Sequence, residues 1–525
     1  MTEPTLDRAA WWQSGVIYQI YPRSFQDSDG DGVGDLRGIE ARLEHLTWLG
    51  IDAIWLSPIY PSPMADFGYD ISDYTDVAPL FGTLADLDRL VAAAHDRGIR
   101  VLLDFVPNHT SDQHPWFVAS RSSRDDPKRD WYLWADPRPD GSPPNGWQSM
   151  FGGPAWTFDE PTGQSYYHAF LAEQPDLDWR NPAVVAAMLD VLRFWFERGI
   201  DGFRIDVLWL LLKETDWARA EDPASPWTGR ADLPELAELV ARLRATADEY
   251  AGDRVLIGEI YLPIDRLVAY YGSATQPGIH LPFNFQLITQ PWDAAGIAGI
   301  VAAYEAALPP GAWPNWVLGN HDQSRIASRV GPAQSRVAAM LLLTLRGTPT
   351  IYYGDEIGMT DVEVPPDRRV DPAPQARDPE RAPMRWDGSP LGDFTTGEPW
   401  LPVSPSGSPD VASQRDDPAS MLQLQHRLLM LRRAEPALSV GGWRGLDGPP
   451  GTIVYERRAG DRRIVVALGL DGAAHRVELR DRASGTILMD TSLRRIGELV
   501  DGTLELAPDE GVIVALDGSV AAPAP

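Results

Sequence analysis

The chain has 525 residues, no cysteine and a formal net charge of −29 at pH 7. Its length corresponds to roughly two to four domains. The lack of cysteine excludes disulfides, thiolate catalysis and Cys-ligated metal clusters. An acidic surface repels nucleic acids and anionic membranes, so we expect neither as a partner.

The first residues carry no targeting signal that we recognise. Met1–Asp7 (MTEPTLD) has neither the basic region nor the apolar region of a secretory signal. No apolar run reaches the length of about 18 residues that is needed to span a bilayer. We therefore expect a cytoplasmic protein.

Short apolar segments alternate with amphipathic helical stretches up to about residue 435. Near-continuous apolar strands between helices are typical of a parallel sheet that is buried on both faces. Eight such segments predict a (β/α)8 TIM barrel in the α/β class. The predicted strands are Val16–Pro22, Ile51–Pro58, Ile99–Pro107, Ile200–Val207, Val255–Ile260, Ile279–Phe285, Asn315–Asn320 and Thr348–Tyr353.

Two interruptions and a change of pattern divide the chain. Residues 105–175 are too long for a strand-to-helix loop and indicate an inserted subdomain after the third strand. Residues 356–420 are rich in Pro, Asp and Gly and predict a long irregular loop. Beyond about residue 436, short alternating strands predict a C-terminal antiparallel β-sandwich. The expected domains are a barrel (1–104 and 176–435), an insert (105–175) and a C-terminal domain (436–525).

Carboxylates follow three of the predicted strands. Asp206, Glu259 and Asp322 come at the ends of the fourth, fifth and seventh strands, where barrel enzymes carry their active sites. Two carboxyl groups can cleave a glycosidic bond, one attacking the anomeric carbon and one protonating the leaving oxygen. Arg204 shares the face of Asp206, and we expect its cation to keep Asp206 ionised. A structural ion pair at the barrel mouth would account for Arg204 and Asp206 if they stood alone. It does not account for Glu259 and Asp322 at two further strand ends.

Several segments resemble the signature regions of the α-amylase superfamily, glycoside hydrolase family 13. They occur in the family's order: DFVPNH (104–109), GFRIDV (202–207), IGEI (257–260) and LGNHD (318–322). The opening VIYQIYPRSFQDSDGDGVGDL and the segment FLAEQPDLDW are similar to exo-acting α-glucosidases and oligo-1,6-glucosidases. The resemblance runs over most of residues 11–435.

The resemblance implies a role for each matching residue. It makes Asp206 the nucleophile, Glu259 the acid/base and Asp322 the third carboxylate, which orients the sugar. The side chains that contact the sugar or the nucleophile are then Arg204, His109, His321 and the stacking residue Tyr69.

The resemblance also implies a closed pocket. Asp70 would read the non-reducing end of the substrate and pair with Arg377, while Gln174 would help to close the same pocket. Val207, next to the nucleophile, resembles a linkage selector and implies mixed α-1,4 and α-1,6 activity. For a retaining enzyme, we expect the carboxyl groups of Asp206 and Glu259 to lie about 5–5.5 Å apart.

The leading hypothesis is therefore a retaining exo-α-glucosidase acting on neutral substrates such as maltose, isomaltose and short oligosaccharides. It needs no organic cofactor and would be a monomer or small homo-oligomer. A transglucosylase, or an enzyme of the sucrose-isomerase or trehalose type, is an alternative on the same scaffold. The stretch LPFNF (281–285) lacks the charged cluster of isomerase-type relatives, which disfavours that option. A non-catalytic sugar-binding subunit is a third possibility, but such proteins usually lose a catalytic carboxylate.

An acidic loop follows the first predicted strand. Asp27, Asp29 and Asp31 alternate, Val33 can offer its carbonyl, and Asp35 completes a spacing like that of an EF-hand loop. The twelfth position is glycine, so the usual bidentate glutamate is missing. The resemblance implies a structural Ca²⁺ or Mg²⁺ here, and a solvated acidic turn is the other interpretation.

Overall fold

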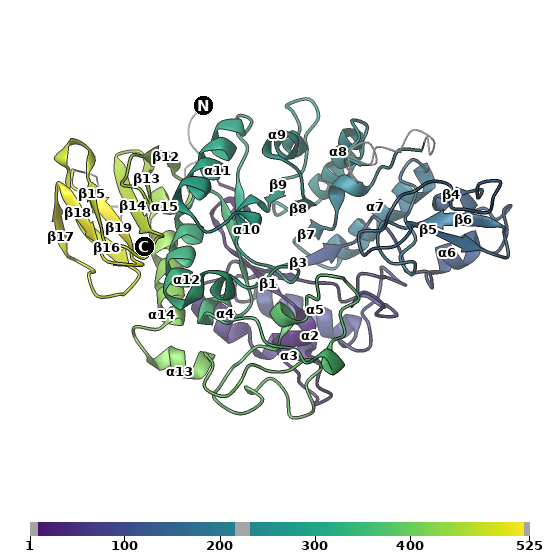
Figure 1. Cartoon of the computed structure of the whole chain (residues 1–525), viewed down its shortest axis with the longest axis horizontal. Coiled ribbons are helices and arrows are strands. Elements are labelled where there is room, and N and C mark those ends of the chain that lie inside the picture. The colour runs from purple at the N-terminus through teal and green to yellow at the C-terminus, as the bar shows by residue number, and fades with distance from the viewer. Residues whose placement is uncertain (1–8, 216–230, 519–525) are drawn as a thin grey trace.

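The computed structural model describes residues 9–215 and 231–518. The first residues, on which the targeting argument depends, lie outside these ranges. Figure 1 places a barrel of strands and helices in the middle of the molecule. The C-terminal strands (yellow) lie at one end and strands β4, β5 and β6 at the other.

Eight parallel strands form the predicted barrel. They are hydrogen-bonded in the order β10-β11-β1-β2-β3-β7-β8-β9. The two end strands meet where Asn284 N donates to the side-chain oxygen of Asn315 at 3.0 Å, which nearly closes the sheet. The strands are β1 (Ile17–Ile20), β2 (Ala53–Leu56), β3 (Arg100–Phe105), β7 (Gly202–Ile205), β8 (Val255–Ile260), β9 (Leu281–Asn284), β10 (Asn315–Val317) and β11 (Thr348–Tyr352).

Helices cover the outside of the barrel, and local sequence sets their ends. Thr83 caps α5 by accepting from Asp86 N, while the Asp86 carboxylate accepts from Thr83 N at 2.8 Å. Gly50 ends α4 in the left-handed conformation (φ 97°) that glycine adopts without strain. The longer helices are α4 (Leu43–Leu49), α5 (Leu84–His95), α7 (Pro182–Glu197), α8 (Leu236–Asp248), α11 (Ala294–Ala307), α12 (Ile326–Thr344) and α14 (Met421–Ala434). Short helices are α1 (Trp11–Ser14), α2 (Pro22–Phe25), α3 (Leu36–Ala41), α6 (Pro115–Ser120), α9 (Ile264–Leu267), α10 (Gln286–Thr289), α13 (Val411–Asp416) and α15 (Pro436–Ser439).

The segment between β3 and α7 contains a small sheet of its own. Its antiparallel strands β4 (Trp134–Ala135), β6 (Gln164–Tyr167) and β5 (Trp156–Asp159) pair in that order. Trp147, Trp156 and Tyr167 form a core that is separate from the barrel core. This segment therefore folds around its own aromatic cluster beside the barrel mouth.

The C-terminal strands are antiparallel, as predicted, and hydrogen bonds join them into one continuous sheet. Their order is β12-β13-β14-β19-β16-β17-β18-β15. Val454 on β13 and Leu504 on β18 share one buried cluster, so the sheet folds over a common core. The strands are β12 (Gly442–Leu446), β13 (Thr452–Ala459), β14 (Arg462–Gly469), β15 (His475–Glu478), β16 (Ser484–Asp490), β17 (Leu499–Asp501), β18 (Thr503–Leu506) and β19 (Gly511–Leu516).

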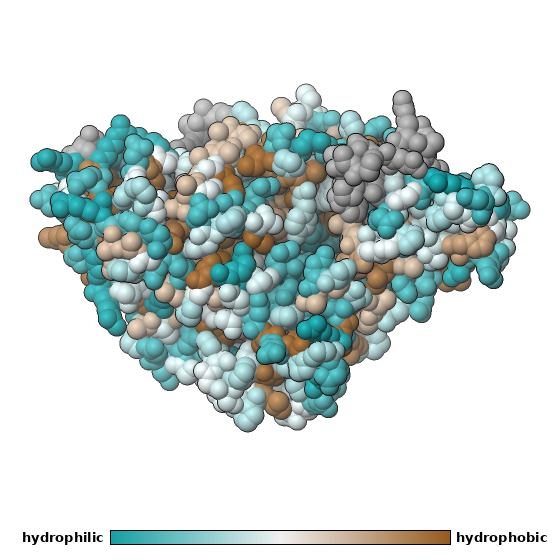
Figure 2. Space-filling model, viewed as in Figure 1, coloured by the Kyte–Doolittle hydropathy of each residue, from teal (hydrophilic) through white to brown (hydrophobic). Residues whose placement is uncertain are grey.

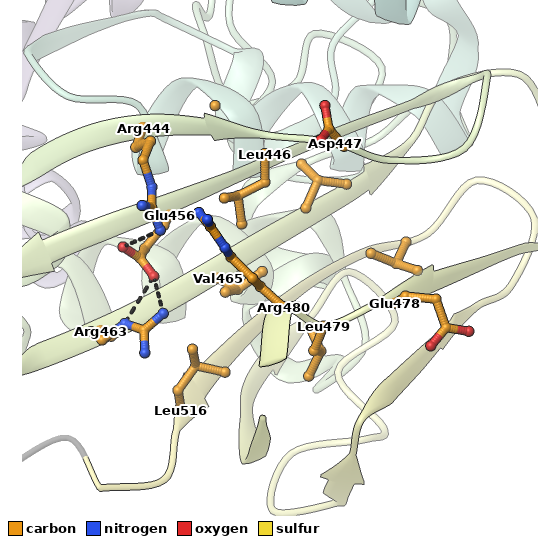
Figure 3. A pocket seen from close by; sticks show the side chains of 13 residues that line it. Arg444, Leu446, Asp447, Glu456, Arg463, Val465, Glu478, Leu479, Arg480 and Leu516 are labelled. Carbon is orange, nitrogen blue, oxygen red and sulfur yellow. Dashed lines mark hydrogen bonds and ion pairs between the residues drawn. The ribbon is translucent and has the colours of Figure 1, made fainter. Parts of the chain in front are cut away.

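A hollow of about 360 Å³ opens in this C-terminal sheet (Figure 3). Glu456 in its wall accepts from Arg463 at 2.7 Å and from Arg444 at 3.1 Å. Two arginines of the wall therefore pair with one of its carboxylates. On the face shown in Figure 2, hydrophobic residues are scattered among hydrophilic ones. Among the described residues, no helix combines the length and hydropathy that crossing a membrane requires.

Candidate active site

A pocket of about 240 Å³ opens at the carboxyl ends of the barrel strands. Loops after β2, β3, β7, β8, β10 and β11 contribute to its wall, together with the inserted segment. The predicted residues that line it are Tyr69, His109, Asp206, Val207, Glu259, His321, Asp322 and Arg377. The strand ends therefore bring together residues that lie far apart in the sequence.

Arg204 contacts three carboxylates at the barrel mouth. Its guanidinium donates to Asp206 Oδ1 at 2.6 Å and to Asp104 Oδ1 at 2.9 Å. The other terminal nitrogen lies 2.7 Å from Glu259 Oε2. Arg204 is only 1% exposed, and Asp206 and Glu259 are 6% and 4% exposed. One buried cation therefore fixes one oxygen of each of the two catalytic candidates.

Burial has the largest effect on the pKa values of the carboxyl groups around Arg204. It raises the pKa of Asp206 well above its ordinary range, and the charge of Glu259 raises it further, although Arg204 lowers it. Burial also raises the pKa of Asp104 to about 6. Arg204 therefore acts on Asp206 in the predicted direction, towards the ionised form, while burial opposes it.

Asp322 lies in a contrasting environment. Its Oδ1 accepts from Arg377 at 3.0 Å and from Arg381 at 2.9 Å. Burial raises the pKa of Asp322, but His321, Arg377 and Arg381 together lower it below its ordinary value. Asp322 therefore stays ionised at neutral pH and can accept hydrogen bonds from sugar hydroxyls.

Arg377 also pairs with Asp66, and not with the predicted Asp70. Arg377 Nη2 donates to Asp66 Oδ1 at 2.9 Å, and Gln174 Nε2 donates to Asp66 Oδ2 at 3.1 Å. Asp70 is fully buried and accepts from Ser62 Oγ and from the amides of Ala65 and Asp66.

The two aspartates have different roles in the same loop. The Asp70 carboxylate satisfies backbone amides and thereby shapes the turn, while that turn directs Asp66 into the pocket. Asp66 stands four positions before Asp70 in the segment ADFGYD and was not among the predicted residues.

Two histidines frame the pocket as neutral rings. Tyr69 Oη lies 2.7 Å from His321 Nε2, and the two rings are stacked. His109 Nε2 lies 3.2 Å from Tyr69 O and 3.1 Å from the amide nitrogen of Gln174. Burial lowers the pKa of His321 to about 3 and that of His109 to about 4. Both can therefore exchange hydrogen bonds with hydroxyl groups without adding charge at neutral pH.

Val207 occupies a strained backbone conformation directly after the nucleophile candidate. Its φ of 35° lies in the left-handed region, which is costly for a β-branched residue. The turn lets Val207 N donate to Glu259 Oε2 at 2.9 Å. Arg204 contacts the same oxygen, so Glu259 Oε2 has two donors.

Two further residues of the site were missed by the sequence reasoning. Arg381 donates to His321 O at 2.7 Å as well as to Asp322. Asp371 accepts from Arg377 at 2.7 Å and so orients that side chain. Arg381 follows Arg377 by one helical turn's spacing in an irregular loop, where no periodicity could single it out.

The acidic loop brings together three of its four predicted carboxylate ligands. Single carboxylate oxygens of Asp27, Asp29 and Asp35 lie within 4.8 Å of one another. Asp31 stands apart from this group, and its Oδ1 accepts from Val33 N at 2.8 Å. Hard carboxylate oxygens at this spacing fit a cation such as Ca²⁺.

Comparison with known proteins agrees with this geometry. The family model described as "Alpha amylase, catalytic domain" matches residues 19–441. A probable α-glucosidase of Rhizobium meliloti (strain 1021) is 41% identical over 513 residues, which cover 91% of this chain and 92% of that protein. An oligo-1,6-glucosidase of Heyndrickxia coagulans is 37% identical and covers 88% and 92% of the two chains. The solved α-glucosyl transfer enzyme XgtA is 38% identical with a TM-score of 0.89, covering 97% of this chain and all of the other.

The barrel, its polar mouth and these matches define a glycoside-hydrolase class of enzyme. The chain belongs to the α-amylase family, glycoside hydrolase family 13.

Proposed function

We propose that the protein is a retaining exo-α-glucosidase in which Asp206 is the nucleophile and Glu259 the acid/base. One observation carries this proposal: both carboxyl groups contact the same buried guanidinium, at 2.6 and 2.7 Å. The two carboxyl groups therefore face one small pocket from the ends of neighbouring strands, the arrangement that double displacement requires.

In the first step, Asp206 attacks the anomeric carbon while the bond to the leaving oxygen breaks. Glu259 gives its proton to that oxygen, and a glucosyl ester of Asp206 forms. In the second step, the Glu259 carboxylate takes a proton from water, whose oxygen attacks the same carbon. The ester bond breaks, Asp206 is regenerated, and glucose leaves with the α-configuration.

The wall beyond the reacting groups supports attack at the chain end. Asp66 and Arg377 form a buried ion pair that closes the pocket, and Gln174 holds Asp66 from the other side. A pocket of about 240 Å³ that ends in an ion pair has room for a short glucosyl end, not for a chain that continues beyond it. We therefore expect one glucose to be released at a time.

Transglucosylation is a second candidate activity. The remaining wall is largely apolar, with Met150, Phe151, Phe170, Trp209 and Tyr261. Such surfaces favour the ring of an acceptor over water at the glucosyl-enzyme stage. The similarity to an α-glucosyl transfer enzyme supports this reading.

We also propose that Asp27, Asp29 and Asp35 hold a structural Ca²⁺. Three clustered carboxylates repel one another unless a cation compensates them. Asp35 caps helix α3 as well, so a bound ion would hold the loop after β1 against that helix.

The proposal is tested by incubating the wild type with p-nitrophenyl α-glucoside, maltose, isomaltose, sucrose and maltotriose. We expect nitrophenol release, and from maltotriose glucose and maltose as the first products. Internal cleavage of longer malto-oligosaccharides would contradict the closed pocket. If all substrates stay intact, the glucosidase assignment is wrong.

A further inference from the structure

Lysine is almost absent from this chain. Of its 46 Lys and Arg residues, two are lysines, Lys128 and Lys213. Lys128 is half-buried on the inserted segment, and its ammonium lies 3.3 Å from the centre of the Trp131 ring. Lys213 follows β7 and is only 2% exposed. A compact ammonium thus occupies an interior position in a chain that otherwise uses arginine, and the two side chains are not interchangeable.

Lys213 joins three segments around the pocket. Its ammonium lies 2.7 Å from Asp176 Oδ2 and donates to Asn108 Oδ1 at 2.6 Å. Asn108 Nδ2 in turn donates to Asp176 Oδ2 at 3.0 Å. The other oxygen of Asp176 accepts from Ala169 N at 2.8 Å. The cluster therefore ties the loop after β3 and the end of the insert to the loop after β7.

This cluster fixes the orientation of the Asn108 amide. An ammonium can only donate hydrogen bonds and a carboxylate can only accept them. Asn108 Oδ1 must therefore face Lys213, and its NH₂ group must face Asp176. The same NH₂ group lies 3.1 Å from His109 Nδ1, which consequently accepts. The ring proton of His109 is then on Nε2, where Tyr69 O lies 3.2 Å away and can accept it. The Gln174 amide nitrogen, 3.1 Å from Nε2, donates to Asp66.

Lys213 also sets the charge around His109. Burial lowers the pKa of His109 to about 4, Asp176 acts to raise it, and Lys213 acts to lower it. The ammonium thus compensates the carboxylate that would otherwise favour an imidazolium. The other charged side chains of the pocket are Asp66, Arg204, Asp206, Glu259, Asp322 and Arg377.

We propose that Lys213 is a positioning residue that keeps His109 neutral and fixes its ring nitrogens, by holding the Asn108 amide and compensating the Asp176 carboxylate. Its effect on catalysis rests on the proposed function. Its effect on His109 does not.

The first test follows His109 directly by NMR, with ¹³Cε1-histidine in the full-length protein. The chain has nine histidines, and His109→Gln identifies the signal. In the wild type, we expect no titration of His109 between pH 5 and 8. In Lys213→Met, the uncompensated Asp176 should raise its midpoint by about two pH units. The double variant Lys213→Met/Asp176→Asn has lost both charges, so its midpoint should return below pH 5.

Kinetics give an independent readout. With a midpoint near pH 6, about a quarter of His109 is neutral at pH 5.5, so kcat/KM of Lys213→Met should fall about fourfold there relative to pH 7.5. Lys128→Met, which removes the other lysine, should keep the wild-type pH profile. Lys213→Arg retains the charge and should keep His109 neutral, while its bulkier head lowers Tm.

A purely structural Lys213 would give a different pattern. Lys213→Met would then lose thermal stability while its His109 signal stayed untitrated above pH 5, which overturns the proposal. If Lys213→Met does not fold, Lys213→Gln supplies the same loss of charge with a neutral amide. If no variant of the enzyme cleaves α-glucosides but the NMR shift is present, the proposed function fails and the positioning role stands.

Discussion

Asp66 and Asp70 offer a matched pair of substitutions that separates the pocket from the turn that supports it. Both side chains are buried, at 4% and 0% exposure, and they stand in the same loop. Asp66 accepts from Arg377 and Gln174 at the pocket wall. Asp70 accepts from Ser62 and two backbone amides. We predict that Asp66→Asn impairs catalysis and that Asp70→Asn impairs stability.

The magnitudes follow from these contacts. A hydrogen bond to a charged group contributes about 1.5–3 kcal/mol, and each 1.4 kcal/mol corresponds to about a tenfold change. Asp66→Asn should therefore lower kcat/KM on maltose by about 10- to 100-fold, mainly through KM. Asp70→Asn leaves amides poorly satisfied and should cost about 1–3 kcal/mol of folding free energy. Its kcat/KM should stay within about threefold of the wild type.

The assay is initial-rate kinetics on maltose beside thermal unfolding for all three proteins. The control variant is Arg369→Met. Arg369 is exposed and lies in the same loop as Arg377, so its replacement reports unspecific effects of a loop substitution. The reasoning is refuted if Asp70→Asn loses activity at unchanged Tm while Asp66→Asn behaves like the wild type.

The remaining predictions concern the cation, pH and product. Chelation of divalent cations should lower the wild-type Tm by several degrees, and added Ca²⁺ should restore it. Asp27→Asn should abolish this response. An unchanged wild-type Tm after chelation would exclude a stabilising ion. The pKa of Asp322 is lower in the folded protein than in the unfolded chain, where it is near 4, so ionised Asp322 stabilises the fold above about pH 4. This stabilisation is lost as the pH falls further. Asp322→Asn should therefore flatten the decline of Tm below about pH 4. The first glucose released should be the α-anomer by NMR, and a β-anomer would rule out retention. Both maltose and isomaltose should be hydrolysed, and a strong preference for maltose would count against Val207 as a linkage selector.

The barrel could be predicted because its strands are short apolar runs separated by helices with recognisable ends. The carboxylates Asp206, Glu259 and Asp322 could be predicted because the carboxyl ends of barrel strands share one mouth. Glycines in the left-handed conformation, such as Gly50, mark the helix ends in sequence and structure alike.

Other features depend on tertiary contacts that no local pattern reports. The choice between Asp66 and Asp70 is decided by which carboxylate the backbone amides take up. Arg381 reaches the site from an irregular loop, where spacing along the chain carries no information about direction. The raised pKa of Asp206 follows from its burial, which the neighbouring arginine in the sequence did not indicate.

The covalent role of Asp206 is the central claim, and trapping the intermediate tests it most directly. The acid/base variant Glu259→Gln should be mixed with α-glucosyl fluoride, whose leaving group needs little help from an acid. We predict that a glucosyl adduct accumulates on the peptide that contains Asp206. No adduct should form in the double variant Glu259→Gln/Asp206→Asn. An adduct on another residue, or rapid turnover by the double variant, would contradict the account.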